Sequence, residues 1–127
     1  MDLFVAVQKL DQQGNLLSIP FSGQPHGGIS GMLRVSHREL DEERSTPSEP
    51  YLKHRRQQLL KPNEIVPVEI PLWPLGMLWH AGQQLRVVVS DHAQATGNGW
   101  DLINRGEHMI HTGGKYDSHL LVPVIPR

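Results

Sequence analysis

Ser30 is the nearest match in this sequence to a catalytic nucleophile, because glycines lie on both sides of it. A nucleophile elbow has the pattern Gly-x-Ser-x-Gly on a turn from a strand to a helix, since only small neighbours permit so tight a bend. Gly28 is in place, but Gly31 comes one position early, and the flanking residues predict neither the strand nor the helix. We therefore predict that Ser30 is a loop residue and that the chain has no catalytic residue.

The eight histidines are the next candidates, since imidazole is a common metal ligand. Their closest grouping with an acid is the segment from Glu107 to His111. A zinc protease places two histidines four residues apart on one helix, with a glutamate beside the first. Here the two histidines are three apart, and the glycines around them argue against a helix. The glycine pairs at 27–28 and 113–114 also lack the downstream helix of a phosphate loop. We predict no metal site and no cofactor.

Charge and cysteine content exclude several classes of protein. Twelve basic and thirteen acidic side chains give a net charge of −1, which provides no basic field for nucleic acid or anionic lipid. The absence of cysteine excludes disulfides and thiolate sites. The first residues show neither a basic leader nor an apolar stretch long enough for a signal peptide or a membrane span. We expect a cytoplasmic protein without nucleic-acid or membrane partners.

The first half of the chain predicts strands joined by long loops. Leu3 to Leu10 is apolar on both faces, which is typical of a strand at the centre of a sheet. A turn with Gly14 at positive φ then leads to a short strand, Leu16 to Ile19, that completes a hairpin. After a glycine-rich loop, Met32 to Arg38 predicts a half-buried strand. The irregular stretch from Glu39 to Asn63 follows, in which a short helix at Lys53 to Leu60 is possible.

The second half predicts further strands. Ile65 to Leu72 is expected to be an edge or bulged strand, because its two prolines cannot donate to a ladder. Leu85 to Ser90 is β-branched and predicts the clearest core strand, and His119 to Ile125 predicts a last strand. Six or seven short strands with no helical periodicity indicate an all-β, two-sheet sandwich in a single domain of residues 1–127.

Tryptophan is the residue type here that could bind a sugar by stacking. Trp100 lies in a polar, glycine-containing loop and is the best exposed candidate, whereas Trp73 and Trp79 fit a core or an interface. A carbohydrate-binding module is therefore an alternative function.

Several segments, in order along the whole chain, resemble one domain family. They are the opening strand with its Gly14 turn, residues 33–38 running into 44–47, residues 60–64, residues 81–86, and residues 111–126. Together they are similar to the C-terminal, non-catalytic domain of the X-prolyl dipeptidyl-peptidase and cocaine-esterase family of α/β-hydrolases.

This resemblance implies a jelly-roll β-sandwich of the galactose-binding type that packs on the α/β-hydrolase catalytic domain and supports assembly. It transfers no catalytic residue, because the serine, aspartate and histidine of the family belong to that other domain. The chain alone is then expected not to be an enzyme. Arg38, Arg44 and Tyr51, in the stretch rich in charges and prolines, are the expected docking contacts.

The chain departs from the family in one respect. The family domain has additional strands before the one that Asp2-Leu3-Phe4-Val5 resembles. A sandwich lacking its first strands exposes strand edges, which proteins cover by pairing with another chain. If these residues are a complete folded chain, we expect a homo-oligomer through these edges. The alternative is that Met1 is an internal methionine and the domain is truncated at its N-terminus. A structural oligomerisation module remains an alternative to the accessory domain.

Overall fold

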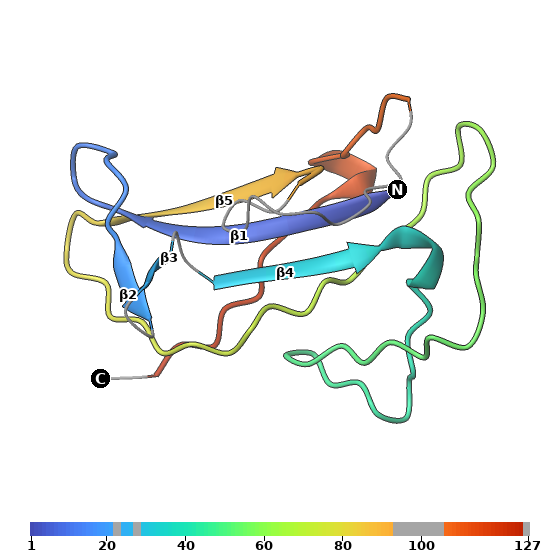
Figure 1. Cartoon of the computed structure of the whole chain (residues 1–127), viewed down its shortest axis with the longest axis horizontal. Helices are drawn as coiled ribbons and strands as arrows, with labels where there is room; N and C mark the ends of the chain where they lie inside the picture. Colours follow the sequence, from blue (N-terminus) through green and yellow to red (C-terminus); the bar gives the residue numbers. More distant parts are fainter. Residues whose placement is uncertain (22–23, 27–28, 93–105, 126–127) are drawn as a thin grey trace.

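A computed structural model describes residues 1–21, 24–26, 29–92 and 106–125. In these residues the regular structure consists of strands and two single-turn 3₁₀ helices, with no α-helix (Figure 1). The all-β class predicted from the sequence is confirmed. The elements are β1 (Asp2–Leu10), β2 (Ile19–Phe21), β3 (Gln24–His26), β4 (Ile29–Arg34), η1 (Val35–His37), β5 (Gln84–Ser90) and η2 (Gly114–Tyr116).

The main sheet has three antiparallel strands in the order β4-β1-β5. Figure 1 shows β1 between its two neighbours. Val5 of β1 lies opposite Gly31 of β4 on one side and Val89 of β5 on the other. The strands β2 and β3 form a separate two-stranded sheet. The predicted central position of the first strand is confirmed.

Strand β1 is buried on both faces, as its sequence predicts. Leu3 and Val7 on one face and Phe4 and Ala6 on the other are all at most 9% exposed. Directly opposed residues of antiparallel strands point to the same face, so the register defines what we call the apolar face. It carries Leu3, Val5 and Val7 of β1, Ile29, Gly31 and Leu33 of β4, and Leu85, Val87 and Val89 of β5.

Polar pairs on the second face join β1 to each neighbour. The Arg34 guanidinium donates two hydrogen bonds to the buried Asp2 carboxylate, at 2.7 and 2.9 Å. This carboxylate raises the pKa of Arg34. Arg86 of β5 donates to the side-chain oxygen of buried Gln8 at 2.8 Å. These contacts fix the register, because a one-residue slip would move each partner to the opposite face.

The turn after β1 follows the sequence prediction in part. Gly14 has φ +86°, and the Asp11 carboxylate accepts bonds from the backbone and side chain of Asn15 and the backbone of Gln13. The Asn15 side-chain bond is the main reason that the pKa of Asp11 is lowered. The chain reverses, but only a single bridge, Leu10 to Leu16, joins the two arms. The predicted strand at Leu16 to Ile19 is wrong, since β2 begins at Ile19 and pairs with β3.

Strand β4 begins earlier than predicted and ends at Arg34, where η1 turns the chain. Ser30 therefore lies inside a strand, opposite Ala6, and the prediction that it is a loop residue is wrong. Leu33 and Val35 are 3% and 1% exposed, which confirms the predicted burial of this face.

Strand β5 exists as predicted, but it is not a core strand. Leu85, Val87 and Val89 are 42–44% exposed, and no described strand pairs with its outer side. An alternating β-branched pattern shows which side chains share a face, and it does not show whether another layer covers them.

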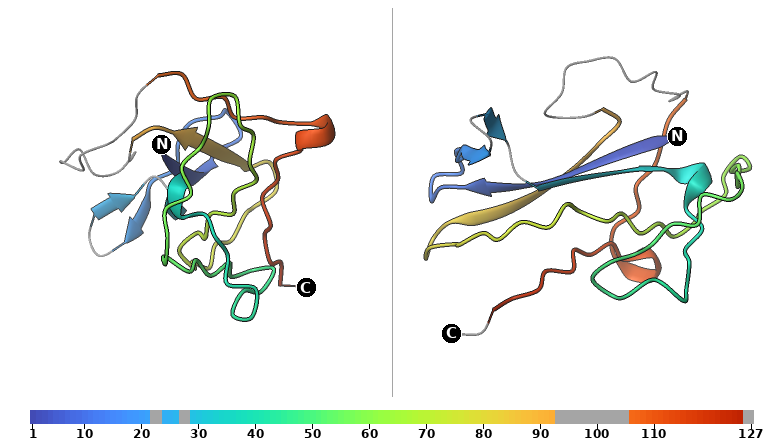
Figure 2. Two further views of the ribbon diagram at one scale, coloured as in Figure 1. Left: turned by 90° about the vertical axis from the view of Figure 1, so that its right-hand side faces the viewer. Right: turned by 60° about the horizontal axis from the view of Figure 1, so that its bottom comes forward.

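Two further segments predicted as strands have no regular structure. Ile65 to Leu72 and His119 to Ile125 form no ladder, and Lys53 to Leu60 forms no helix. The first of these segments nevertheless packs against β4, since Pro71 and Leu72 leave no room for a side chain at Gly31 of the apolar face. The backbone N–H of Trp73, the next residue, donates to the Ser30 carbonyl at 3.1 Å. Figure 2 shows residues 65–79 below the sheet, with the C-terminal segment beyond them.

The two sides of β4 should differ sharply in their contribution to stability. We expect Leu33→Ala to lower the free energy of unfolding by about 2–5 kcal/mol, because it opens a cavity in the core. Met32→Ala, in the same strand but at a side chain that is 53% exposed, should change it by about 0.5 kcal/mol or less. Urea unfolding measures both values. Equal losses would contradict the assignment of faces.

Gly31 tests the packing of residues 65–79 on the sheet. A Cβ atom there would collide with the Pro71 carbonyl oxygen and touch the Leu72 side chain. Gly31→Ala should therefore lower the free energy of unfolding by about 1–3 kcal/mol. Gly76→Ala is the matched control, since nothing lies within 4 Å of its added methyl group. A neutral Gly31→Ala would show that this segment does not lie on β4.

Candidate functional site

Residues 39–58, which we call the docking loop after the docking contacts that the sequence predicts in it, form an ordered excursion beside the sheet. Isolated bridges join Leu40 to Leu52 and Thr46 to Glu49. The Asp41 N–H donates to the Tyr51 carbonyl at 2.7 Å, and the Lys53 N–H donates to the Glu39 carbonyl at 2.9 Å. The loop thus folds back on itself, in the manner of the compact long loops that often carry function.

Arg44 and Tyr51 form the most prominent side-chain pair of the docking loop. The Arg44 guanidinium carbon lies 3.6 Å from the centre of the Tyr51 ring, in cation–π geometry. Ser45 holds Tyr51 in place, because its hydroxyl accepts a bond from the Tyr51 N–H at 2.9 Å. Tyr51 remains 40% exposed. The two sequence-predicted residues therefore meet, and they present an aromatic and a guanidinium group of the kind enriched at protein interfaces.

Arg38, the third predicted contact, is used inside the chain. Its Nη1 atom donates to the Val35 carbonyl at 3.0 Å and to the Gln58 carbonyl at 2.7 Å. The Gln58 N–H in turn donates to the Ser36 carbonyl at 2.7 Å. Arg38 therefore connects the end of the docking loop to η1. Among the described residues, no hydrogen bond or ring contact joins Arg38 to the Arg44–Tyr51 pair.

Glu39 anchors the loop at its other end. Its carboxylate accepts two bonds from Arg56, at 2.8 and 3.2 Å, and lies 3.4 Å from the Lys53 ammonium. The bond from Arg56 is the main reason that the pKa of Glu39 lies below its ordinary value. Sequence reasoning missed this cluster, because the partners are 14 and 17 residues away in an irregular segment.

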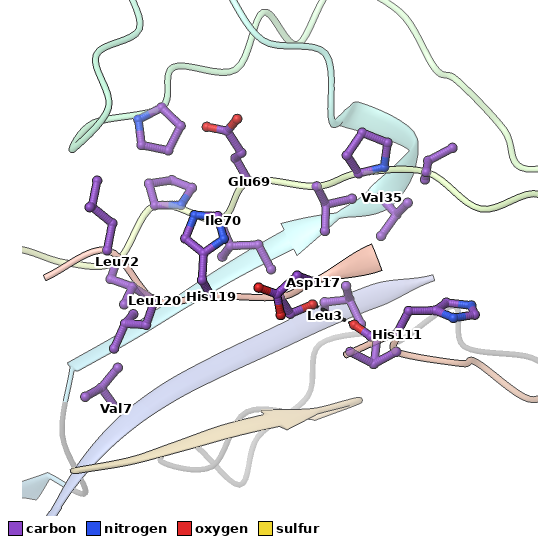
Figure 3. A pocket seen from close by; sticks show the side chains of 18 of the residues that line it. Leu3, Val7, Val35, Glu69, Ile70, Leu72, His111, Asp117, His119 and Leu120 are labelled. Carbon is purple, nitrogen blue, oxygen red and sulfur yellow. Dashed lines mark hydrogen bonds between the residues drawn. The ribbon is translucent and has the colours of Figure 1, made fainter. Parts of the chain in front are cut away.

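A large cleft lies between the apolar face and the segments that cross it (Figure 3). Its volume is about 3230 Å³. Ordinary small-molecule pockets measure about 300–1,000 Å³, so this open space is several times larger than such a pocket. Leu3 and Val7 of β1 line it together with Ile70, Leu72 and Leu120.

Several polar side chains also line the cleft. His119, Asp117 and Glu69 lie on its wall (Figure 3). The His111 ring packs on Tyr116, with the ring centres 5.2 Å apart. No group of three or more metal-ligating side chains occurs in the described residues.

Two of the three tryptophans, Trp73 and Trp79, lie in the described part of the chain, and both line the cleft. Trp100 lies outside the described residues. Trp73 is 77% exposed at the cleft, whereas the Trp79 ring lies 5.8 Å from the Lys9 ammonium and its N–H donates to the Gln84 carbonyl at 3.4 Å. Trp79 thus fastens the crossing segment to the sheet. A sugar-binding role for Trp100 stays a prediction.

Comparison with known proteins identifies the relatives of this chain. Residues 1–121 match the family described as the X-Pro dipeptidyl-peptidase C-terminal non-catalytic domain. Two crystal structures of a CocE/NonD family hydrolase from Staphylococcus aureus are similar at 46% identity, with TM-scores of 0.72 and 0.73. The similarity covers 77% of this chain and 18% of that hydrolase. No curated protein gave a significant match.

None of the described residues belongs to a helix that is long and apolar enough to cross a membrane.

The Glu39 anchor should make the stability of the chain depend on pH. The pKa of Glu39 is lowered from 4.5. The ion pairs therefore contribute fully above about pH 4.5, and this contribution disappears as the pH falls through the lowered folded-state pKa. We expect Glu39→Gln to lower the thermal midpoint at pH 7 and to have a smaller effect at pH 3.

Thermal unfolding followed by circular dichroism at both pH values measures this difference. Glu43→Gln is the matched control, because that carboxylate lies in the same loop and is exposed. Equal effects of Glu39→Gln at pH 7 and pH 3 would contradict the role of the charge.

Proposed function

Because the chain belongs to the X-Pro dipeptidyl-peptidase C-terminal non-catalytic domain family, we propose that it is the accessory unit of a CocE/NonD-type serine hydrolase. Its role is to pack on the catalytic domain and to support assembly of the enzyme. Its residues 1–127 form one domain, a jelly-roll sandwich similar to galactose-binding folds. The reaction, with peptide or ester substrates, belongs to the rest of the hydrolase.

The position of Ser30 supports a non-catalytic role. A hydrolase nucleophile must stand on a turn that exposes its hydroxyl at the start of a helix. Ser30 instead lies within β4, and its backbone carbonyl accepts a bond from the crossing segment. The chain spans 18% of the length of the hydrolase that it resembles, which leaves ample length for a separate catalytic unit.

The docking loop is the surface that we assign to the catalytic domain. Its backbone bridges, the Glu39 anchor and the Arg38 tie hold it in one conformation before binding. A preformed loop loses less conformational entropy on association than a disordered one. The exposed Arg44–Tyr51 pair is the single observation that carries this assignment.

Substitution of this pair tests the proposal. We expect Arg44→Ala together with Tyr51→Ala to weaken binding of the chain to a CocE/NonD catalytic domain by about tenfold or more, because aromatic and arginine side chains dominate interface energetics. Ser48→Ala, in the same loop, should leave the affinity unchanged. Isothermal titration calorimetry measures each affinity.

The same experiment includes a labelling control. An active-site serine probe should label the catalytic domain and leave this chain unlabelled. Unchanged affinity of the double variant would refute the assignment of the loop, and labelling of this chain would refute the non-catalytic role.

A further inference from the structure

A short basic segment, residues 53–56, lies in the second half of the docking loop, and we call it the basic bend. It consists of Lys53, His54, Arg55 and Arg56 and contains no acid. Its last three residues are exposed, whereas Lys53 is half-buried. The whole chain has a net charge of −1, so the basic bend is a local concentration of positive charge on a molecule that is otherwise close to neutral.

Hydrogen bonds of the backbone hold the basic bend at both ends. At its start, the Lys53 N–H donates to the Glu39 carbonyl at 2.9 Å. Two residues after its end, the Gln58 N–H donates to the Ser36 carbonyl at 2.7 Å. The backbone that carries Arg55 is therefore fixed between two anchors before any partner binds, which reduces the conformational entropy lost on association.

Arg55 differs from the other arginines of the described residues. Those arginines donate side-chain hydrogen bonds within the chain or lie over an aromatic ring, and they are Arg34, Arg38, Arg44, Arg56 and Arg86. Arg55 forms no hydrogen bond, ion pair or ring contact in the described part of the chain. A guanidinium presents its N–H donors in a planar fork that matches a carboxylate. The fork of Arg55 is therefore available to an anionic group of a partner.

The remaining acids of the docking loop indicate which kind of anion fits. Within the described residues none of them forms an ion pair, and they are Asp41, Glu42, Glu43 and Glu49. An extended polyanion such as nucleic acid would meet these like charges in the same loop, at a cost in electrostatic energy. A protein surface carries its charges singly, so one carboxylate can face Arg55 without opposing the loop's own acids.

We propose that the basic bend binds a carboxylate on the surface of the catalytic domain, and that Arg55 makes the contact. This inference rests on the docking function proposed above and adds the chemistry of the partner, which is an exposed aspartate or glutamate opposite residues 53–56. The Arg44–Tyr51 pair supplies packing, and Arg55 supplies the charge-dependent part of the affinity. The association therefore weakens as the salt concentration rises.

Charge reversal at Arg55 tests this proposal, with a CocE/NonD catalytic domain as the probe. We expect Arg55→Glu to raise the dissociation constant by about tenfold or more at about 50 mM sodium chloride, because it places two carboxylates together, and by much less at about 500 mM. Arg55→Lys keeps the charge and loses the fork, so its effect should be intermediate. Lys115→Glu is the matched control, since it changes the net charge equally at an exposed residue of η2.

Isothermal titration calorimetry at both salt concentrations measures these constants. Thermal unfolding should show that the Arg55 variants are as stable as the parent chain, because Arg55 has no contact in the chain to lose. Equal effects of Arg55→Glu and Lys115→Glu, or equal effects of Arg55→Glu at the two salt concentrations, would overturn the inference. Binding of a single-stranded DNA oligonucleotide that Arg55→Glu abolishes would also overturn it, because that result assigns the basic bend to a polyanion.

The double variant of Arg44 and Tyr51 separates this inference from the proposed function. If that variant binds weakly and Arg55→Glu binds like the parent chain, the docking loop is confirmed as the interface and only the carboxylate contact is refuted. A parent chain that does not bind the catalytic domain refutes both.

Discussion

Burial of β1 on both faces is the constraint on which the rest of this structure depends. Leu3 and Val7 are removed from water on one face, and Phe4 and Ala6 on the other. A strand of this kind requires a neighbour on each edge and a layer on each face, since its backbone groups must be hydrogen-bonded and its side chains covered. Both neighbours, β4 and β5, are antiparallel and bind it in a register set by side-chain pairs.

The features that the sequence predicts correctly are those that depend on local patterns. Strand β1 itself, the Gly14 turn and the burial of Leu33 and Val35 follow from local patterns, because each depends on residues close in the chain. The failures lie where a second layer decides the outcome. Residues 65–72 lose ladder donors at two prolines and pack as extended chain, and β5 has the pattern of a core strand without a cover. The ion pairs of Glu39 correspond to no periodic pattern in the sequence.

The molecule has two surfaces of different character, one polar and one apolar. The docking loop is polar, is held by its own hydrogen bonds, and exposes an arginine and a tyrosine. The edge of β5 and the cleft beneath the sheet are apolar and expose residues that usually lie inside. In the described residues, neither surface holds a cluster of three or more metal-ligating side chains. The family to which the chain belongs is described as a non-catalytic domain.

Residue-resolved amide hydrogen exchange tests the central claim most directly. If β1 holds the sheet together, its amides exchange only through global unfolding and are the slowest in the chain, while amides of the docking loop exchange through local opening at far lower free energy. We expect the amides of β1 to be slower than those of the docking loop. If the amides of β1 exchange as fast as those of residues 39–58, the sheet does not depend on this strand, and the central role of β1 is contradicted.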